Sequence, residues 1–340
     1  MADESEAGAR PEWFVHGGRL RAAAAAFPDA PRPWIDLSTG LNPQPWQGKA
    51  GEVDWGPLPD AGDLLALEAT AAAHFGAPPA HVCALPGTEI GLRLLGSFGL
   101  PKPVSVVAPG YSTHLDAFAG ARPIGIAAID DAAADGGTLL LANPNNPDGR
   151  LLSPERLIAL ASRLRERQGL LIVDEAFADM AGGVGLAPHL TAELTPHVVL
   201  LRSFGKFFGL GGLRLGFAIA DETWRASFRH RLGSWPLSAA ALAIGTAAYR
   251  DRAWIEATRH RLVEDAARLD ALLAAHGLAA RGACPLFRLV DTPDAQIIFQ
   301  RLMRHGLLSR PFAYAPRWLR FGLPGDETAW ERLDRALADG

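Results

Sequence analysis

The sequence predicts an α/β fold with a mainly parallel sheet, followed by a smaller α+β domain. Between about residues 82 and 220, short runs of strand-forming residues alternate with helical stretches, which is typical of parallel strands joined by helices. Several of these runs end directly in polar or Gly/Pro-rich segments, where open α/β sheets bind their ligands. Beyond about residue 222 the pattern changes to long Ala/Leu/Arg-rich helices and a few short strands. A ligand site is therefore expected at the strand ends of the first domain.

Taken in order, the chain is expected to begin with an arm at 1–45, in which the alanine run 22–26 forms a short helix that ends near a Pro-rich stretch. A large domain follows at 46–222. Its strands are expected at 82–86, 104–109, 138–144, 170–176, 197–204 and 213–220. A small C-terminal domain at 223–340 begins with long helices and ends with short strands.

Composition limits the possible partners and the compartment. The chain carries 33 Lys and Arg against 37 Asp and Glu, so no overall positive field would attract nucleic acid or an anionic membrane. Cys83 and Cys284 match no metal spacing and fit a reducing compartment. The first ten residues are acidic and lack the basic start and apolar run of a signal peptide. A cytoplasmic protein is therefore expected.

Three common ligand motifs are missing from the sequence. A phosphate loop of the G-x-x-x-x-G-K-[ST] type needs Ser or Thr after the lysine, but Phe207 follows Lys206. The stretch 209–214, GLGGLR, ends in Arg214 where a dinucleotide-binding loop needs its last glycine. The ten histidines include no H-E-x-x-H, so a metal hydrolase has no motif and no metal ion is expected.

Lys206 is a candidate nucleophile because its neighbours are unlike a solvated surface stretch. Phe204, Phe207 and Phe208 surround it in the sequence, and the glycines that follow allow close approach of the backbone. An amine in a partly apolar pocket loses its proton more readily and can then form a Schiff base. The alternative is an exposed lysine in a loop.

Three other strand ends carry polar residues whose roles stay open when each is taken alone. The stretch 142–149, ANPNNPDG, is either a binding loop or a tight turn before a helix that Ser153 caps. Asp174 ends an apolar strand, where it either needs a cation or caps a helix. The stretch 85–95, LPGTEIGLRLL, starts an amphipathic helix whose free N–H groups suit a phosphate, although many helices begin this way.

Together and in this order, these stretches resemble the aminotransferase-like, fold-type-I family of pyridoxal 5′-phosphate enzymes over nearly the whole chain. The spacing of Ser203, Lys206 and Arg214 is the most specific part of the resemblance. It implies a large cofactor-binding domain with a mainly parallel sheet, a smaller α+β domain, and pyridoxal 5′-phosphate as the cofactor.

By resemblance, each polar group of the cofactor has a partner in this chain. Lys206 forms a Schiff base with the aldehyde, Asp174 pairs with the pyridine nitrogen, and Asn146 donates to the ring oxygen. Tyr111 falls where the family stacks an aromatic side chain on the ring, and Tyr111, Asp174 and Lys206 are the expected catalytic residues. The residues expected around the cofactor phosphate are Gly87, Thr88, Glu89, Ser203 and Arg214.

Four further residues are expected to bind the substrate. Arg320 stands where the family binds the α-carboxylate, a task that suits a bidentate guanidinium. Arg310 matches a second family arginine, while His16 and Asn42 lie in the arm segments HGG and IDLSTGLNP. The alternatives are a surface arginine at the edge of a strand and a histidine that only orders the arm.

Two features narrow the choice within the family. The HGG start, and Phe177 in DEAF where many relatives read DEAY, resemble the threonine-phosphate decarboxylases of cobalamin biosynthesis, which are close to the histidinol-phosphate aminotransferases. The resemblance implies decarboxylation of O-phospho-L-threonine to (R)-1-aminopropan-2-yl phosphate. One alternative is an aminotransferase that acts on histidinol phosphate or a similar amino acid. The other is a scaffold or regulator that binds pyridoxal phosphate without turnover.

The expected partners are a small phosphorylated amino acid and a second copy of the chain, with no nucleic acid and no membrane. The homodimer is implied by resemblance. Leu58 stands where many relatives carry a tyrosine that reaches the cofactor phosphate of the neighbouring subunit. A cofactor contact across the dimer interface is therefore less strongly implied than the dimer itself.

Overall fold

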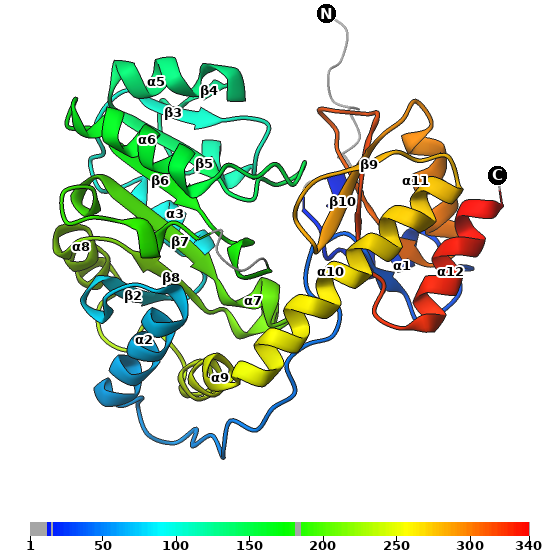
Figure 1. Ribbon diagram of the computed structural model, residues 1–340. Coiled ribbons are helices and arrows are strands. Elements are labelled where there is room, and N and C mark those ends of the chain that lie inside the picture. The colour runs from blue at the N-terminus through cyan, green and yellow to red at the C-terminus, as the bar shows by residue number, and fades with distance from the viewer. Residues whose placement is uncertain (1–11, 15, 181–184, 340) are drawn as a thin grey trace, which may run out of the picture. The chain divides into compact units, whose positions relative to one another are not determined.

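The computed structural model describes residues 12–14, 16–180 and 185–339, and the chain divides into two compact units (Figure 1). The larger unit comprises Gln44–Val263 and Ala283–Pro285. The smaller unit comprises Met1–Pro43, Glu264–Gly282 and Leu286–Gly340.

The larger unit is built on a seven-stranded sheet with the order β2-β8-β7-β6-β5-β3-β4. The strands are β2 (Val82–Leu85), β3 (Val104–Val107), β4 (Arg122–Ile124), β5 (Thr138–Ala142), β6 (Leu170–Asp174), β7 (Val198–Ser203) and β8 (Gly216–Ile219). Strand β8 runs antiparallel to both of its neighbours, and the other strands run parallel to one another. The predicted α/β class and mainly parallel sheet are confirmed. The short edge strand β4, with the sequence RPI, was missed because it lacks an apolar run.

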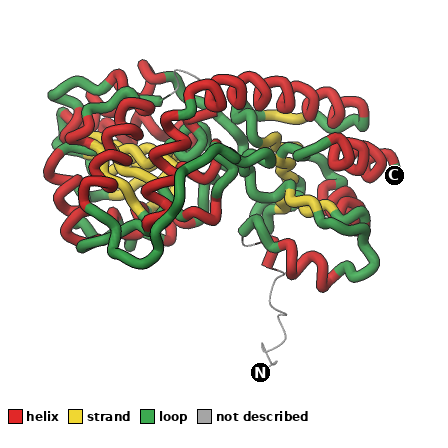
Figure 2. The backbone as a smooth tube through the Cα atoms, turned by 90° about the horizontal axis from the view of Figure 1, so that it is seen from below, coloured by secondary structure: helices red, strands yellow, loops and turns green. Residues whose placement is uncertain are grey.

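Helices cover both faces of this sheet (Figures 1 and 2). The helices of the larger unit are α2 (Ala61–Phe75), α3 (Thr88–Leu95), α4 (Thr113–Asp116), α5 (Ile129–Asp135), α6 (Pro154–Arg165), α7 (Phe204–Phe207), α8 (Glu222–Leu232), α9 (Ala239–Arg250) and the first half of α10 (Arg252–Ala275). Leu92 of α3 and Phe228 of α8 share one core cluster with Leu85 and Leu201 of the strands. Because both faces are covered, all five residues of β6 are buried, which explains its continuous apolar run.

Capping residues in the sequence set several helix ends. The Asp60 side chain accepts the Gly62 N–H at the start of α2, and Gly76 ends that helix with a left-handed φ of 67°. The Ser153 side chain accepts the Arg156 N–H at the start of α6, and Pro154 takes the first helical position, as predicted.

The smaller unit contains a four-stranded antiparallel sheet of order β12-β13-β10-β9 and a separate parallel pair, β1 with β11. The strands are β1 (Ile35–Asp36), β9 (Ala280–Arg281), β10 (Phe287–Asp291), β11 (Leu307–Leu308), β12 (Arg310–Pro311) and β13 (Trp318–Gly322). The helices are α1 (Leu20–Ala26), α11 (Ala295–Arg304), α12 (Glu327–Ala338) and the end of α10. The predicted α+β character and the short helix at the alanine run are confirmed.

The two units divide the chain differently from the predicted boundaries. The larger unit continues past 222 to Val263, because α9 packs along α2 while α8 packs against α3 and β2. The described part of the predicted arm, up to Pro43, belongs to the smaller unit, because β1 pairs with β11. Among the described residues, no helix has both the length and the apolar character needed to cross a membrane.

Candidate active site

The carboxyl ends of the parallel strands meet at one edge of the larger sheet. Ala142 at the end of β5 pairs with Asp174 at the end of β6. Ser203 at the end of β7 and Leu85 at the end of β2 both pair with Gly216, the first residue of β8. The predicted cofactor residues all flank these ends: Gly87, Thr88, Glu89, Tyr111, Asn146, Asp174, Ser203, Lys206 and Arg214. The fold thus brings together at one edge residues that span 128 positions from Gly87 to Arg214.

Asp174 is a buried carboxylate whose two oxygens are both oriented. One oxygen, Oδ2, lies 2.9 Å from Nε2 of His114, and the other accepts the backbone N–H of Ala176 at 3.1 Å. The Asp174 side chain is 8% exposed, and that of His114 is 1% exposed. The carboxylate is therefore held in one direction before any ligand binds.

His114 on α4 is a site residue that the sequence analysis did not single out. Because an ionised carboxylate only accepts hydrogen bonds, Nε2 of His114 carries the proton in this pair. Within the described part of the chain, its buried Nδ1 has no hydrogen-bond partner. The only sequence signal was its position three residues after Tyr111, in the segment that follows β3.

The asparagine loop after β5 is fixed mainly by two of its three asparagines. The Asn143 side chain exchanges two hydrogen bonds with the backbone of Leu152, at 3.0 and 2.7 Å. The Asn145 amide donates to the Pro109 carbonyl at 3.1 Å, which ties this loop to the one that follows β3. Asn146, the predicted cofactor partner, is half-buried on the same loop. The turn and binding interpretations of this stretch are thus compatible.

Lys206 lies on the one-turn helix α7, directly after β7, and is half-buried. Its Nζ lies 5.6 Å from the centre of the Phe177 ring. Phe204, Phe207 and Phe208 are fully buried, and the Phe204 and Phe208 rings stack at 4.4 Å. The neighbouring phenylalanines therefore anchor the helix in the core, and the Phe177 ring lies near the amine.

The start of α3 and the Arg214 guanidinium lie close together and form a site suited to an anion. A Cβ atom on Gly87 would lie 2.8 Å from Nη2 of Arg214, and Gly87 has a φ of 90°. Within the described structure no side chain caps this end of α3, so its first N–H groups are not satisfied by a cap. A cation beside free helical N–H groups is an arrangement that binds phosphate.

Glu89 uses its side chain for another purpose than the predicted phosphate contact. Its carboxylate accepts the Tyr111 hydroxyl at 3.0 Å and pairs with Arg93 at 2.8 Å. Burial raises the pKa of Tyr111, so the phenol keeps its proton and donates a hydrogen bond to the Glu89 carboxylate. Since a carboxylate repels phosphate, Glu89 can offer an anion only its backbone N–H.

The four predicted substrate residues all belong to the smaller unit. Arg310 and Arg320 stand opposite each other in the antiparallel register of β12 and β13. Arg320 is 4% exposed and donates to the Ser38 carbonyl, while Arg310 donates to the Trp13 carbonyl. Asn42 is buried and His16 is half-buried. These residues come from the segment 12–43 and the last sheet, and they share a unit separate from the one that holds Lys206.

Comparison with known proteins identifies the family. Residues 125–337 match the model for the aminotransferase class I and II family. The chain is 39% identical to a Sinorhizobium sp. protein named threonine-phosphate decarboxylase, over 96% of this chain and 98% of that one. A Pseudomonas aeruginosa protein of the same name is 38% identical over 95% and 96%. A histidinol-phosphate aminotransferase from Paracoccus denitrificans is 33% identical over 64% of this chain and 63% of its own.

Solved structures agree in fold. A histidinol-phosphate aminotransferase from Sinorhizobium meliloti, in complex with pyridoxal-5′-phosphate, has a TM-score of 0.77 at 22% identity, covering 94% of this chain and 93% of that one. The L-threonine-O-3-phosphate decarboxylase from Porphyromonas gingivalis has a TM-score of 0.73 at 16% identity, covering 89% and 98%. The chain belongs to the class I and II aminotransferase family, and it is a pyridoxal-phosphate-dependent enzyme. The predicted family and cofactor are confirmed.

Proposed function

We propose that the protein decarboxylates O-phospho-L-threonine to (R)-1-aminopropan-2-yl phosphate, a step of cobalamin biosynthesis. The observation that carries this proposal is the similarity, over nearly the full length of both chains, to two proteins named threonine-phosphate decarboxylase. The match to the Paracoccus histidinol-phosphate aminotransferase covers less of the chain at lower identity. Phe177 and the HGG start, which indicated the same subgroup, are consistent with it.

The larger unit supplies groups that fit pyridoxal phosphate. The phosphate would bind at the start of α3 beside Arg214, where any side chain on Gly87 would fill the space. Lys206 would hold the aldehyde carbon, and the Asp174 carboxylate, oriented by His114, would accept a hydrogen bond from the protonated ring nitrogen. When bound, pyridoxal phosphate accepts the electron pair left behind when a bond at the substrate Cα breaks.

The smaller unit supplies groups that fit a substrate with two anionic ends. Arg310 and Arg320 stand opposite each other in the register of β12 and β13, so one small sheet presents two guanidinium groups at neighbouring positions. We assign the α-carboxylate to Arg320 and the substrate phosphate to Arg310 and His16, with Asn42 beside them.

In the proposed reaction the bond between Cα and the carboxylate carbon breaks, carbon dioxide leaves, and Cα takes up one proton. We assign delivery of the proton at Cα to Nζ of Lys206, because the amine that is proposed to hold the aldehyde carbon is the titratable group assigned next to the reacting carbon. No keto acid takes part, because the amino group stays on the product.

The alternative function is transamination of histidinol phosphate or a similar amino acid. Histidinol phosphate has no carboxylate, but an aminotransferase also binds a dicarboxylate partner, so the arginine pair fits both reactions. Purified protein should therefore be assayed with a panel of phosphorylated amino acids, with and without 2-oxoglutarate. We expect phosphothreonine to be consumed at the same rate in both conditions. Dependence on the keto acid would support the aminotransferase, and binding of the cofactor without any turnover would support the scaffold.

We also propose a cytoplasmic homodimer. The exposed apolar residues Leu58 and Trp235, 65% and 58% exposed, line two hollows of about 740 and 330 Å³ on the larger unit. The hollows share Pro59, Asp60 and Leu242, so they adjoin. A second copy of the chain would cover these two exposed apolar side chains. Analytical ultracentrifugation should give a dimer mass, and Trp235→Glu should lower the association constant.

A further inference from the structure

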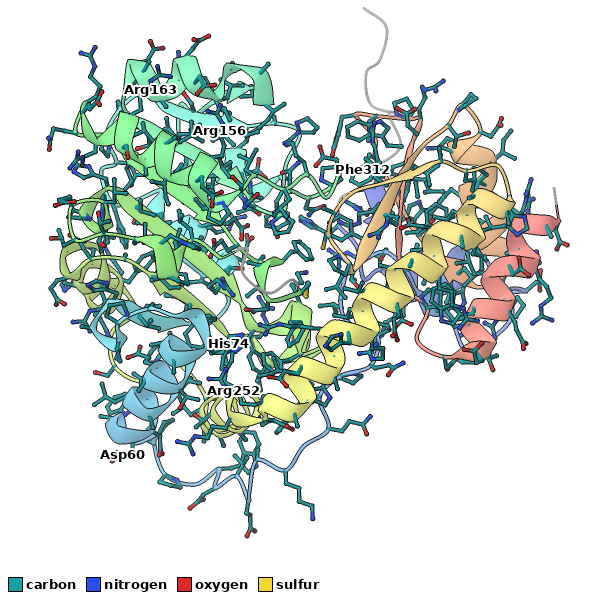
Figure 3. All side chains as sticks on the ribbon, in the orientation of Figure 1. Asp60, His74, Arg156, Arg163, Arg252 and Phe312 are labelled. Atoms are coloured by element: carbon teal, nitrogen blue, oxygen red, sulfur yellow. The ribbon has the colours of Figure 1, made fainter. Side chains whose placement is uncertain are left out.

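The larger unit contains a buried ionic cluster that the proposed reaction does not use. Arg202 of β7 lies between two carboxylates: its Nη1 is 3.0 Å from Oε2 of Glu175, and its Nη2 pairs with Oδ1 of Asp179. Asp179 also lies 3.2 Å from Nε2 of His74, which is on α2 (Figure 3). All four side chains are 5% exposed or less. We call Arg202, Glu175, Asp179 and His74 the arginine cluster.

The arginine cluster lies on the opposite face of the sheet from the cofactor residues. Successive side chains of a strand point to opposite faces. Leu201 belongs to the core cluster on the α3 and α8 side, so Ser203 shares that side and Arg202 points to the other. By the same alternation Asp174 shares a side with Ile172, and Glu175 faces Arg202.

The ion pair between Glu175 and Arg202 lies directly beside two of the predicted site residues in the sequence. Glu175 follows Asp174 directly, and Arg202 precedes Ser203 directly, so the ion pair joins β6 and β7 one residue from each site residue. The Glu175 N–H also donates to the Leu201 carbonyl at 2.8 Å. Its Oε1 accepts the Leu186 N–H at 2.7 Å, so both carboxylate oxygens are used. The end of β6, which carries Asp174, is thereby fastened to the end of β7, which leads directly into the helix that carries Lys206.

Stability alone does not explain such a cluster. Burying charges costs free energy that their attraction repays only in part, and apolar residues of similar size often serve as well. The surroundings are built around the guanidinium: the Phe75 ring centre lies 4.7 Å from it, and a Cβ on Gly185 would lie 2.7 Å from Nη1. A planar guanidinium group that binds two carboxylates fixes the distances and angles between them, whereas an apolar contact would not.

We propose that Arg202 and Glu175 are positioning residues for the cofactor: their ion pair fixes the separation of Asp174 from Lys206 from the far side of the sheet. The proposal rests on the proposed assignment of Asp174 and Lys206 to the pyridine nitrogen and the aldehyde. It predicts that loss of the pair weakens cofactor binding and changes the environment of the bound cofactor, whatever the substrate is.

The test is a titration of the cofactor-stripped full chain with pyridoxal phosphate, followed by a pH titration of the visible absorption band. Arg202→Met should raise the apparent Kd about 10-fold, the lower end of the effect seen when a metal ligand loses the hydrogen-bond partner that orients it. Arg202→Lys, which keeps a charge without the fork, should fall between Met and the wild type. The pH midpoint of the band should shift in both variants.

Glu175→Gln gives a second and milder measurement. The amide keeps the shape and the oxygen that accepts the Leu186 N–H but removes the charge opposite Arg202. If Arg202→Met does not fold, the result is read from this variant, for which we expect a raised Kd and a shifted midpoint. Wild-type values for both quantities in Glu175→Gln would overturn the proposal.

Arg288→Met is the matched control. Arg288 is also a buried strand arginine with a bidentate carboxylate partner, Asp270, at 2.6 and 3.0 Å, but it lies in the smaller unit. The substitution Arg288→Met should lower the melting temperature without changing the Kd for pyridoxal phosphate or the pH midpoint of the absorption band. An equal rise in Kd in this control would show that the effect is general destabilisation and would also overturn the proposal. Wild-type protein that binds pyridoxal phosphate but does not decarboxylate phosphothreonine contradicts only the proposed reaction.

Discussion

The two units hold their ligand residues in different ways. In the larger unit Asp174 is oriented by another buried side chain, that of His114. In the smaller unit Arg310 and Arg320 instead donate to the backbone carbonyls of Trp13 and Ser38, in the N-terminal segment. On the proposed assignments, the carboxylate for the cofactor is therefore held by a side chain of its own sheet, whereas the arginines for the substrate are held by the backbone of a segment far away in the sequence. Substitutions in the two units should differ in what they disturb.

The largest expected effect belongs to Lys206. Lys206→Ala should abolish turnover, because this amine is assigned both the covalent link to the cofactor and the proton at Cα. Borohydride reduction of the holoenzyme followed by peptide mapping should find the cofactor on Lys206. Lys102→Ala, which changes an exposed lysine of the same unit, should leave activity unchanged. A cofactor found on Lys49 or Lys102, the two other lysines of the chain, would contradict the assignment.

Arg310→Ala should have the second-largest effect on activity, and it should weaken binding of the substrate alone. Losing one charged partner of a buried anion costs about 2–5 kcal/mol. The kcat/KM for phosphothreonine should fall by the factor that corresponds to this free energy, while the low rate with threonine should change little. Cofactor affinity should not move. Arg304→Ala, an exposed arginine of the same unit, is the control. An equal loss with both substrates would remove the assignment of the phosphate to Arg310.

Asp174→Asn should have a smaller effect, on the cofactor side. The amide keeps the shape but removes the charge that holds a proton on the pyridine nitrogen. Loss of a charge-assisted hydrogen bond is worth about 1.5–3 kcal/mol, and the transition state should feel more of it than the ground state. We expect kcat to fall while the cofactor still binds through its phosphate. Steady-state kinetics with unchanged turnover would refute the role.

The smallest effects concern stability, and their pH dependence should have opposite signs in the two units. In the larger unit, burial raises the pKa of Glu68 above 4.5, and the Ala84 N–H and Arg229 offset this only in part. The contribution of Glu68 to the free energy of unfolding is fully present below pH 4.5. It is lost as the pH rises through the pKa of Glu68 in the folded protein. In the smaller unit, hydrogen bonds from Arg317 and Trp318 lower the pKa of Asp291 below 3.8, so its contribution is lost as the pH falls.

Urea unfolding at several pH values checks both signs. Relative to the wild type, Glu68→Gln should become more stable as the pH rises from 4.5 to 7. Asp291→Asn should lose less stability than the wild type as the pH falls below about 4. If the free energy of unfolding depends on pH in the same way in the variant and the wild type, the sign given for that residue is contradicted.

Much of the larger unit could be predicted because its signals are local. Apolar runs marked six strands, and the polar residues after them marked the edge where the site lies. The unit boundary could not be read, because only packing against α2 assigns α9 to the larger unit. His114 was missed for a similar reason, since its pairing with Asp174 joins residues 60 positions apart.

The contacts that each side chain of a motif makes were harder to predict than the position of the motif in the fold. Glu89 is predicted near the phosphate, and the structure adds that its carboxylate accepts the Tyr111 hydroxyl. Arg202 and Glu175 stand inside the stretches that drew attention to Lys206 and Asp174, yet nothing in the linear sequence showed that they pair on the opposite face. Strand alternation separates neighbours in the sequence, and only the register between β6 and β7 shows which of them meet.

Release of carbon dioxide decides whether the enzyme removes the carboxylate and leaves the amino group in place. The gas should be measured with O-phospho-L-threonine, the holoenzyme and no keto acid. We expect one carbon dioxide for each phosphothreonine consumed, an amine product that keeps its phosphate, and no change on adding 2-oxoglutarate. Turnover that requires 2-oxoglutarate and yields glutamate without carbon dioxide would contradict decarboxylation, and transamination would take its place.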